Sequence, residues 1–430
     1  MGLVRRRTRV RLREKIILMW RRREKVKKDI LFLCQFFYPE HNSSATLPFD
    51  TAQYLANHGF SVDALCGYPK EYSDGQAVPL REVKDGVGIQ RLRYIQLGRV
   101  STLGRLINYF SFTASALLRI GELRKYKTVI VYSNPPILPL VPVLANFLFG
   151  TKIVFVAYDV YPEIAYASNS LRPGCLIDRA MKWLNHRLYR RVSRVVALTD
   201  EMKEFLLEHR PELTEDRVAV IPNWAHEEKA AEPTPEAYER FDFEPGQFIV
   251  SYFGNMGTCQ EMETLLGAMR QLKDNREIQF LFVGHGNKKP HVEEVAKETG
   301  NAKVFDFLTG EAFEQALAIS SCCVVSLEKG LKGMCAPSKY YSYLQAGKSV
   351  LAIVEEGTYL AREITEDENG CFSLIGDLRG LVQKISGLQQ NPDMVRRMAA
   401  RSENLYAEKY ALPICMGKYL DLFRGLAEGE

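Results

Sequence analysis

The sequence predicts an α/β chain of two doubly wound domains in series, and three observations lead to this prediction. Short, nearly continuous apolar runs rich in β-branched residues alternate with helical stretches, which is typical of parallel sheets covered on both faces. This alternation pauses once, at residues 224–247, and then resumes. At 430 residues with 46% hydrophobic content, the chain is long enough to bury two cores.

The first predicted domain spans residues 29–223, with helical stretches such as 48–58 and 175–191 between its strands. Those strands are expected at 30–36, 61–67, 128–133, 152–158 and 194–199. Residues 224–247 are polar, acidic and interrupted by Pro, as expected of a linker.

The second predicted domain spans residues 248–390. Its strands are expected at 248–254, 278–284, 303–307, 322–327 and 349–354. From 391 to 430 the chain is predicted to be helical and to pack across both domains, whose strand ends face a central cleft.

The net charge of +5 is the sum of a strongly basic N-terminal arm, residues 1–28, and a mildly acidic remainder of the chain. Residues 1–28 hold thirteen Lys and Arg against Glu14 and Glu24, a local charge of +11 that leaves −6 for the rest. Apolar residues between the basic clusters suit an amphipathic element on anionic lipid, and we expect this arm to bind an anionic membrane surface. A nucleic-acid-binding arm is the rival hypothesis, and a disordered tail or an upstream start artefact is the other; we expect no nucleic-acid partner.

Nine cysteines occur without a Cys-x-x-Cys pair or a His/Cys cluster, which predicts buried free thiols in a reducing compartment and no structural zinc. No apolar stretch has membrane-spanning length, and the short run at residues 15–20 cannot be a signal-peptide core. We therefore expect a cytoplasmic protein that lies peripherally on the inner face of the cell membrane.

The residues that follow the predicted strands are the candidates for chemistry, because open parallel sheets bind ligands beyond the carboxyl ends of their strands. In the second domain, Gly254 and Gly257, then Gly284 and Gly286, then the stretch 337–347 form three helix starts. Such starts favour phosphate, although a Gly turn after a strand can also be only a tight connection.

In the first domain, Asp159 and Glu163 follow an apolar strand inside the predicted cleft. A carboxylate there could orient or deprotonate a hydroxyl, and a helix cap at Asp159 with a solvated Glu163 is the alternative. His41, with Asn42, Ser43 and Ser44, follows the first strand. A lone His is usually a surface or structural residue, and we do not favour a direct catalytic role for it.

The order of several short stretches resembles the retaining GT-B-fold glycosyltransferases of family 4, over residues 29–410. The resemblance is closest to the branch of capsule and O-antigen sugar transferases that carry "D-hydrophobic-W-P-E" and "P-S-K" boxes. The stretches are "YPE" (38–40), "SNPP" (133–136), "DVYPE" (159–163), "IPNW" (221–224), "YFGNMG" (252–257), "FVGHG" (282–286) and "PSKYYSYLQAGKSV" (337–350).

The resemblance implies a GT-B fold of two Rossmann-like domains and a nucleotide-sugar donor held mainly by the second domain. Gly254, Asn255 and Gly257 would lie against the donor diphosphate, and Gly284 and Gly286 near the nucleoside. Further donor contacts are expected from the backbone of Phe307 and Leu308 and from Ser338, Lys339, Tyr340 and Ser342. UDP is the nucleotide we expect, with no cofactor and no required metal. The acceptor would lie in the first domain, near His41, Asn42, Ser43 and Asp159.

The sequence departs from the family pattern at the charged positions. A Glu-x7-Glu pair common in the family falls at Met334 and Ser342, and the usual phosphate-binding Arg and Lys fall at Asn255 and Gln260. A leaving nucleoside diphosphate still needs a cation, and Lys339 is the best placed one. We therefore predict Asp159, Lys339 and Glu163 as the catalytic residues.

The resemblance implies a retaining hexosyl- or N-acetylhexosaminyltransferase. Its acceptor would be a polyprenyl-diphosphate-linked saccharide in capsule, O-antigen or exopolysaccharide synthesis. A nucleotide-sugar 2-epimerase of the same fold is one alternative. A membrane-associated scaffold that has lost transferase chemistry is the other, because the Glu pair is missing.

Overall fold

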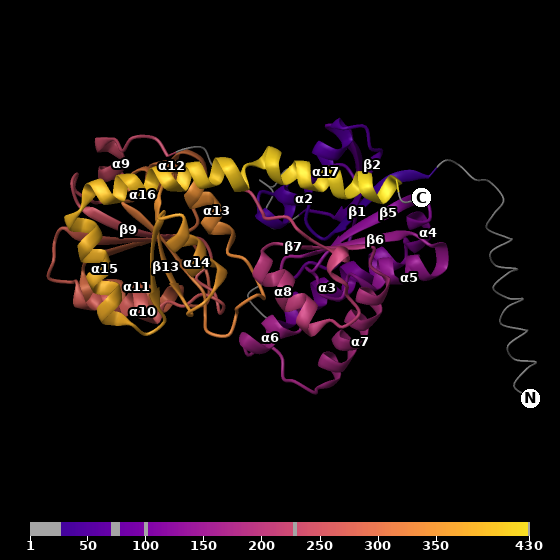
Figure 1. The fold of residues 1–430 in the computed structure, drawn as a ribbon, viewed down its shortest axis with the longest axis horizontal. Helices are drawn as coiled ribbons and strands as arrows, with labels where there is room; N and C mark the ends of the chain where they lie inside the picture. The colour runs from indigo at the N-terminus through magenta and orange to yellow at the C-terminus, as the bar shows by residue number, and fades with distance from the viewer. Residues whose placement is uncertain (1–26, 70–77, 99–101, 227–229, 429–430) are drawn as a thin grey trace, which may run out of the picture.

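The computed structural model describes residues 27–69, 78–98, 102–226 and 230–428, and these residues form two α/β domains that lie side by side (Figure 1). In the described chain the first domain has an eight-stranded sheet in the order β3-β4-β2-β1-β5-β6-β7-β8, with β3 antiparallel to β4 and the other neighbours parallel. The second has a six-stranded parallel sheet in the order β11-β10-β9-β12-β13-β14. This is the predicted fold class.

The strands of the first sheet are β1 Lys28–Cys34, β2 Val62–Gly67, β3 Arg81–Lys84, β4 Val87–Leu92, β5 Tyr126–Tyr132, β6 Lys152–Ala157, β7 Arg194–Ala197 and β8 Val218–Val220. Those of the second are β9 Phe248–Phe253, β10 Ile278–Val283, β11 Ala302–Phe305, β12 Cys322–Ser326, β13 Ser349–Val354 and β14 Gly370–Leu374.

The helices of the first domain are α2 Ser43–Asn57, α3 Thr102–Leu117, α4 Ile120–Leu123, α5 Leu140–Phe149, α6 Glu163–Ala167, α7 Leu176–Arg191, α8 Asp200–His209 and the 3-10 turn η1 Glu215–Arg217. Those of the second are α9 Pro235–Arg240, α10 Glu263–Gln271, α11 Lys289–Thr299, α12 Gly310–Ala318, α13 Ser338–Gln345, α14 Tyr359–Glu366 and α15 Leu378–Gln390.

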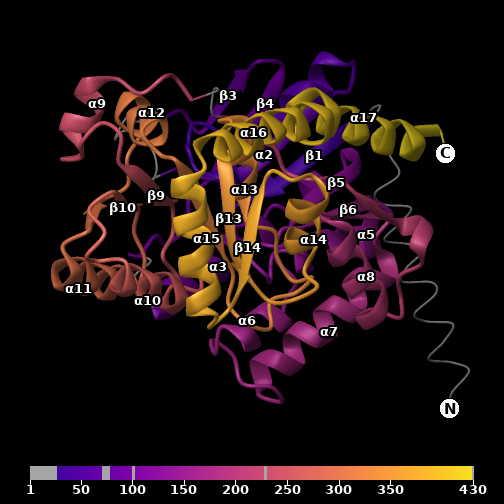
Figure 2. The same ribbon diagram turned by 60° about the vertical axis from the view of Figure 1, so that its left-hand side comes forward.

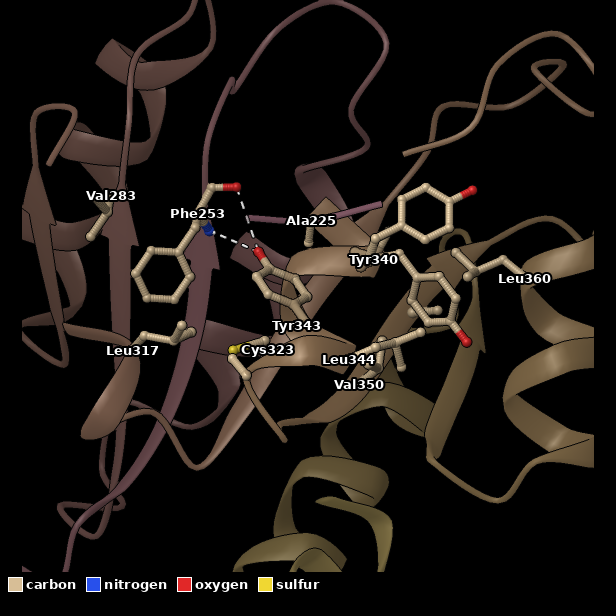
Figure 3. Packing of buried hydrophobic residues seen from close by; sticks show 14 of the residues in the cluster. Ala225, Phe253, Val283, Leu317, Cys323, Tyr340, Tyr343, Leu344, Val350 and Leu360 are labelled. Carbon is tan, nitrogen blue, oxygen red and sulfur yellow. Dashed lines mark hydrogen bonds between the residues drawn. The ribbon is translucent and has the colours of Figure 1, made fainter. Parts of the chain in front are cut away.

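Both faces of each sheet are buried, and this explains why the strands read as continuous apolar runs. In β9, Ile249 and Phe253 enter the core on one face of the second sheet, while Val250 and Tyr252 enter the core on the other. Figure 3 shows Phe253 among the buried side chains of the first of these cores.

Four strands were not expected from the sequence: β3, β4, β8 and β14. β3 and β4 form a hairpin whose turn is Asp85-Gly86, both with positive φ (48° and 81°), as a tight primed turn requires. Their residues are partly polar because they lie at the edge of the sheet, so they lack the apolar run by which the other strands were recognised.

The chain after residue 391 crosses from the second domain to the first, as predicted. Helix α16 (Pro392–Leu405) packs on the second domain, and a π-helical turn, η2 (Tyr406–Tyr410), joins it to α17 (Leu412–Glu428). Figures 1 and 2 show α16 and α17 lying across both domains. Cys415, Tyr419 and Phe423 of α17 are buried in the same core as strand β1. The last helix is therefore part of the first domain's core.

Candidate functional site

The loops at the carboxyl ends of β6 and β12 join the two domains. The Val160 backbone N–H donates to the Met334 carbonyl at 2.8 Å, and Asp159 forms an antiparallel bridge with Cys335. The loop that contains Asp159 in the first domain therefore lies directly against the loop that leads into α13 in the second.

A second contact between the domains comes from Glu201 in α8, which sequence reasoning did not single out. Its carboxylate accepts hydrogen bonds from the backbone N–H groups of Gly333 (3.0 Å) and Tyr359 (2.9 Å), and the residue is only 5% exposed. Burial raises its pKa, while these two hydrogen bonds favour the charged form. Glu201 also lines a small hollow together with Lys332, Cys335 and Glu355.

Lys339 lies in the first turn of α13, half-buried, with its Nζ 3.8 Å from the centroid of the Tyr252 ring. Its ammonium donates to Tyr252 Oη, and that hydroxyl donates to the Asn255 carbonyl at 2.8 Å. Burial lowers the pKa of Lys339 to about 7. The lysine is thus held by an aromatic ring and has no carboxylate partner among the ion pairs of the described chain.

The two Gly-rich loops of the second domain, the first after β9 and the second after β10, are packed against each other. The Met256 N–H donates to the His285 carbonyl at 2.7 Å. A Cβ added at Gly284, where φ is +150°, would lie 1.9 Å from the Gly254 carbonyl oxygen, so only glycine fits there. The Cε of Lys339 would be 3.9 Å from a Cβ built on Gly254. The structure therefore brings Gly254, Gly284 and Lys339 together.

The remaining predicted residues of these loops differ in how accessible they are to a ligand. Asn255 is exposed. The Gly257 N–H donates to Gln260 Oε1 at 3.0 Å, so this N–H can bind a phosphate only if the Gln260 side chain moves. Gly286 lies against Met256, because an added Cβ would be 2.3 Å from the Met256 carbonyl oxygen.

Phe307 follows β11 and is 63% exposed, and its ring centroid lies 6.1 Å from the ring centroid of His285. Leu308 is half-buried and packs against the core of the second domain. Their predicted backbone contacts with a nucleobase stay predictions.

The donor role predicted for the Tyr340 side chain is wrong. Tyr340 is fully buried, accepts from Asn369 Nδ2 at 3.2 Å and packs against Tyr410. Helical periodicity explains this: the buried residues of α13 are Tyr340, Tyr341, Tyr343 and Leu344. Ser338 is exposed and Ser342 half-buried, on the side of the helix that carries Lys339.

Tyr343 also fixes the start of the first Gly-rich loop. Its hydroxyl accepts from the Phe253 N–H at 3.1 Å and lies 3.5 Å from the Phe253 carbonyl, as Figure 3 shows. Helix α13 is therefore tied to the end of β9 on its buried side by Tyr343 and on its open side by Lys339.

Asp159 and Glu163, predicted to act together, have different surroundings. Asp159 is half-buried, its backbone N–H donates to Ser133 Oγ at 3.0 Å, and burial raises the pKa of its carboxyl to about 6. Glu163 begins α6 and pairs with Arg210 at 2.6 Å, and Arg210 also donates to the Tyr161 carbonyl. This ion pair gives Glu163 a structural partner, and its catalytic role stays a prediction.

Like Glu201, Asp159 lies against the second domain, in this case through its backbone bridge with Cys335. Burial and then the charge of Asp159 raise the pKa of the Cys259 thiol, which belongs to the first Gly-rich loop. The same two causes act on Cys335. Asp159 therefore faces the donor-side loops from the acceptor side.

The predicted acceptor residues lie at the start of α2. His41 and Ser43 are exposed, and Asn42 is the residue before the helix, with its Nδ2 buried and unpaired in the described structure. Gln35, which sequence reasoning missed, follows β1 and is 1% exposed, with neither amide atom bonded in the described structure. The sequence feature that could have identified Gln35 is a single amide side chain at the end of an apolar strand. The position of these residues is compatible with the acceptor-side prediction, which remains untested.

The described residues contain neither a metal-binding cluster nor a membrane-spanning helix. No group of three or more His, Cys, Asp or Glu side chains there is close enough to hold a metal ion. Within the same residues, no helix combines the length and apolar content that crossing a bilayer needs.

Comparison with known proteins gives two family matches. Residues 49–224 match the glycosyl transferase 4-like domain, and residues 247–391 match the glycosyl transferases group 1 domain. A probable glycosyltransferase of Pseudomonas aeruginosa, WbjE, is 29% identical over 270 residues, and a putative colanic acid biosynthesis glycosyl transferase of Escherichia coli (strain K12), WcaI, is 24% identical over 272. Each match covers 61% of this chain, and the chain spans only 66% of the length of each relative.

Solved structures share the fold. Sucrose-phosphate synthase from Thermosynechococcus elongatus superposes with a TM-score of 0.72 at 14% identity, covering 94% of this chain and 100% of the other. Anabaena HepE in complex with UDP-glucose gives 0.65 at 14% identity, with coverages of 94% and 100%. WaaG, a glycosyltransferase involved in lipopolysaccharide biosynthesis, gives 0.66 at 14% identity, with coverages of 92% and 100%.

Proposed function

Because the chain belongs to the GT-B glycosyltransferases that join a glycosyl transferase 4-like domain to a group 1 domain, we propose that it transfers a sugar from a nucleoside diphosphate to a hydroxyl acceptor with retention. UDP is the proposed nucleotide. The polysaccharide and lipopolysaccharide relatives support an acceptor that is a growing surface saccharide, and we propose that it is linked to a polyprenyl diphosphate.

The observation that carries the proposal is the position of Lys339. It stands at the start of α13, beside Gly254 and held by Tyr252, and it has no ion-pair partner among the described side chains. A developing diphosphate charge is stabilised most by a cation that is already in place and shielded from water. Lys339 supplies the charge that the Asn255 and Gln260 positions lack.

The acceptor would bind on the other side, where Asp159 reaches toward the second domain. With a pKa near 6, Asp159 is ionised at neutral pH and can accept a hydrogen bond from an acceptor hydroxyl. The departing phosphate can itself take the proton in a retaining transfer, so Asp159 is proposed to orient the acceptor.

The missing Glu pair is the feature that favours the second candidate, a scaffold without transferase activity. In the structure Met334 uses its backbone carbonyl to hold the first domain, and Ser342 lies one turn after Lys339. A 2-epimerase is disfavoured because it needs several acid and base groups around the donor, and Met334 and Ser342 supply none at the positions of the missing Glu pair.

The test begins with binding and then measures transfer. A series of nucleotide sugars is screened by thermal unfolding, since a ligand that binds only the folded chain raises its apparent stability. The donor that stabilises the protein is then supplied in radiolabelled form to the protein together with a bacterial lipid extract. The anomeric configuration of the product is determined by NMR.

The three candidates give different results. A labelled lipid with the anomeric configuration of the donor supports the proposal, and an inverted product contradicts retention. Release of an epimerised nucleotide sugar would favour the epimerase. Binding without any transfer, in wild type and in Lys339→Met alike, would favour the scaffold.

A further inference from the structure

Helix α7 carries an exposed face with a composition that its role in the core does not explain. The helix buries Met181, Leu184 and Leu188 against the first sheet, yet Leu176 (82%), Ile177 (50%) and Trp183 (52%) are exposed. Large apolar side chains gathered on an exposed helix face indicate an interaction surface.

These side chains form one continuous line with basic groups. The guanidinium of Arg187 lies 5.2 Å from the Trp183 ring centroid, and that of Arg191, one turn later, lies 6.0 Å from the ring of Phe147 at the end of α5. Phe147 is itself 59% exposed. Leu176, Trp183, Arg187 and Arg191 therefore share one side of α7, because residues three, four and seven apart lie on the same face of a helix.

The charge of this face has one sign. The sequence of α7, LIDRAMKWLNHRLYRR, holds five Lys and Arg and a single acid, Asp178. Asp178 is only 1% exposed, and it accepts from the Gly174 N–H and from Lys182. The helix itself therefore presents no exposed acidic group, and the neighbouring acid Glu212 is paired with His186 of α7.

We propose that the exposed face of α7, continued by Phe147 of α5, docks the protein onto an anionic lipid bilayer. An apolar stripe flanked by arginines is the pattern that lies at a membrane interface, with aromatic and aliphatic groups at the headgroup level and the guanidinium groups on the phosphates. An acidic protein partner would offer the same charges but would not account for the exposed Leu176, Ile177 and Trp183. This proposal rests on the proposed function, which places a lipid-borne acceptor at the first domain.

The buried side of α7 connects this face to the candidate site. Asn185 donates to the Tyr161 carbonyl at 2.7 Å, and Arg210 donates to the same oxygen at 3.1 Å. Tyr161 lies two residues after Asp159, so α7 directly holds the loop that meets the second domain. Figures 1 and 2 both show α7 on the side of the first domain opposite α17. Docking through α7 would hold the Asp159 loop close to the lipid surface.

The test uses the full-length chain with Trp20→Phe, which leaves two tryptophans. Trp224 is 4% exposed and bonded to Asp50, so Trp183 is the one that can respond to lipid. On addition of phosphatidylglycerol vesicles we expect a blue shift of tryptophan emission and quenching by lipids brominated in the acyl chain. Phosphatidylcholine vesicles should give neither. No enzymatic readout is involved, so failure here and failure of the proposed activity are distinguishable.

Two sets of variants assign the effect to α7. Arg187→Glu combined with Arg190→Glu should lower vesicle partitioning at least about 10-fold, because each basic residue near an anionic surface contributes a factor of about five. Leu176→Ser should weaken it without changing the salt dependence. Val83→Ser is the matched control, since Val83 is 77% exposed at the opposite edge of the sheet, in β3.

Each other outcome overturns the proposal. Co-sedimentation with vesicles but no response of Trp183 would assign binding to the basic arm, residues 1–28, alone. Equal binding to neutral vesicles would remove the role of the arginines. Concentration-dependent dimerisation that protects Trp183 from a soluble quencher, with no vesicle binding, would assign the face to a second copy of the chain.

Discussion

Donor binding should depend on pH through Lys339. Burial lowers its pKa to about 7 in the free protein, so at pH 8 about one lysine in ten is charged. A bound diphosphate favours the charged form and raises this pKa in the complex. Below pH 7 the cation is already present and affinity should be at its maximum. Above pH 7 binding must be coupled to proton uptake, and the donor dissociation constant should rise about 10-fold per pH unit until the raised pKa is reached.

The measurement is isothermal titration calorimetry with the nucleotide diphosphate from pH 6 to pH 9, in two buffers that differ in ionisation enthalpy. The buffer dependence of the heat gives the number of protons taken up. Lys339→Arg should flatten the profile because Arg stays charged throughout. Lys339→Met keeps the packing against Tyr252 and should lower affinity to the same weak value at every pH. A flat profile in the wild type, or a wild-type profile in Lys339→Met, would refute the reasoning.

Four further predictions follow from the same structure. Lys339→Ala should lower turnover by about 100-fold or more with folding intact, as loss of one key electrostatic donor does, and near-normal turnover would remove Lys339 from the site. Asp159→Asn should depress transfer while leaving the donor dissociation constant nearly unchanged, and an equal loss of donor affinity would place Asp159 on the donor side. Glu201→Ala leaves two buried N–H groups unpaired and should lower the free energy of unfolding by about 2–4 kcal/mol, whereas Glu201→Gln, which keeps an acceptor, and Glu204→Ala on the exposed side of α8 should lose far less, as chemical denaturation can show. Deleting residues 1–28 should reduce binding to anionic vesicles at low salt without unfolding either domain, and equal binding by both chains in co-sedimentation would show that the arm contributes nothing.

The layered fold was predictable because burial on both faces leaves a local mark. Strands such as β9 and β13 are buried along their whole length and apolar at all but one position, and this pattern can be recognised without knowledge of their neighbours. The hairpin of β3 and β4 was missed although its Asp85-Gly86 turn is a recognisable signal, since the flanking residues are too polar to read as strands.

The candidate site was only partly predictable. Lys339 was singled out from its place after Pro337 and Ser338, but the sequence says nothing about the Tyr252 ring, 87 residues away, that holds it. Glu201 and Gly333 are 132 residues apart, and their contact exists only because the two domains meet. Tyr340 was misassigned because the face of a helix that meets the core is decided by its neighbours, although the spacing of three tyrosines already indicated a buried stripe.

The position of α17 has a consequence for how the protein is made. Residues 412–428 complete a core that begins with β1, so the first domain cannot close that core until almost the whole chain has been synthesised. Up to that point the apolar surface of β1 and α2 that α17 will cover stays open to water. The second domain has no such dependence on α17 and can fold earlier. A truncation before residue 412 should therefore yield a chain whose first half, although intact in sequence, is prone to aggregation and dependent on chaperones.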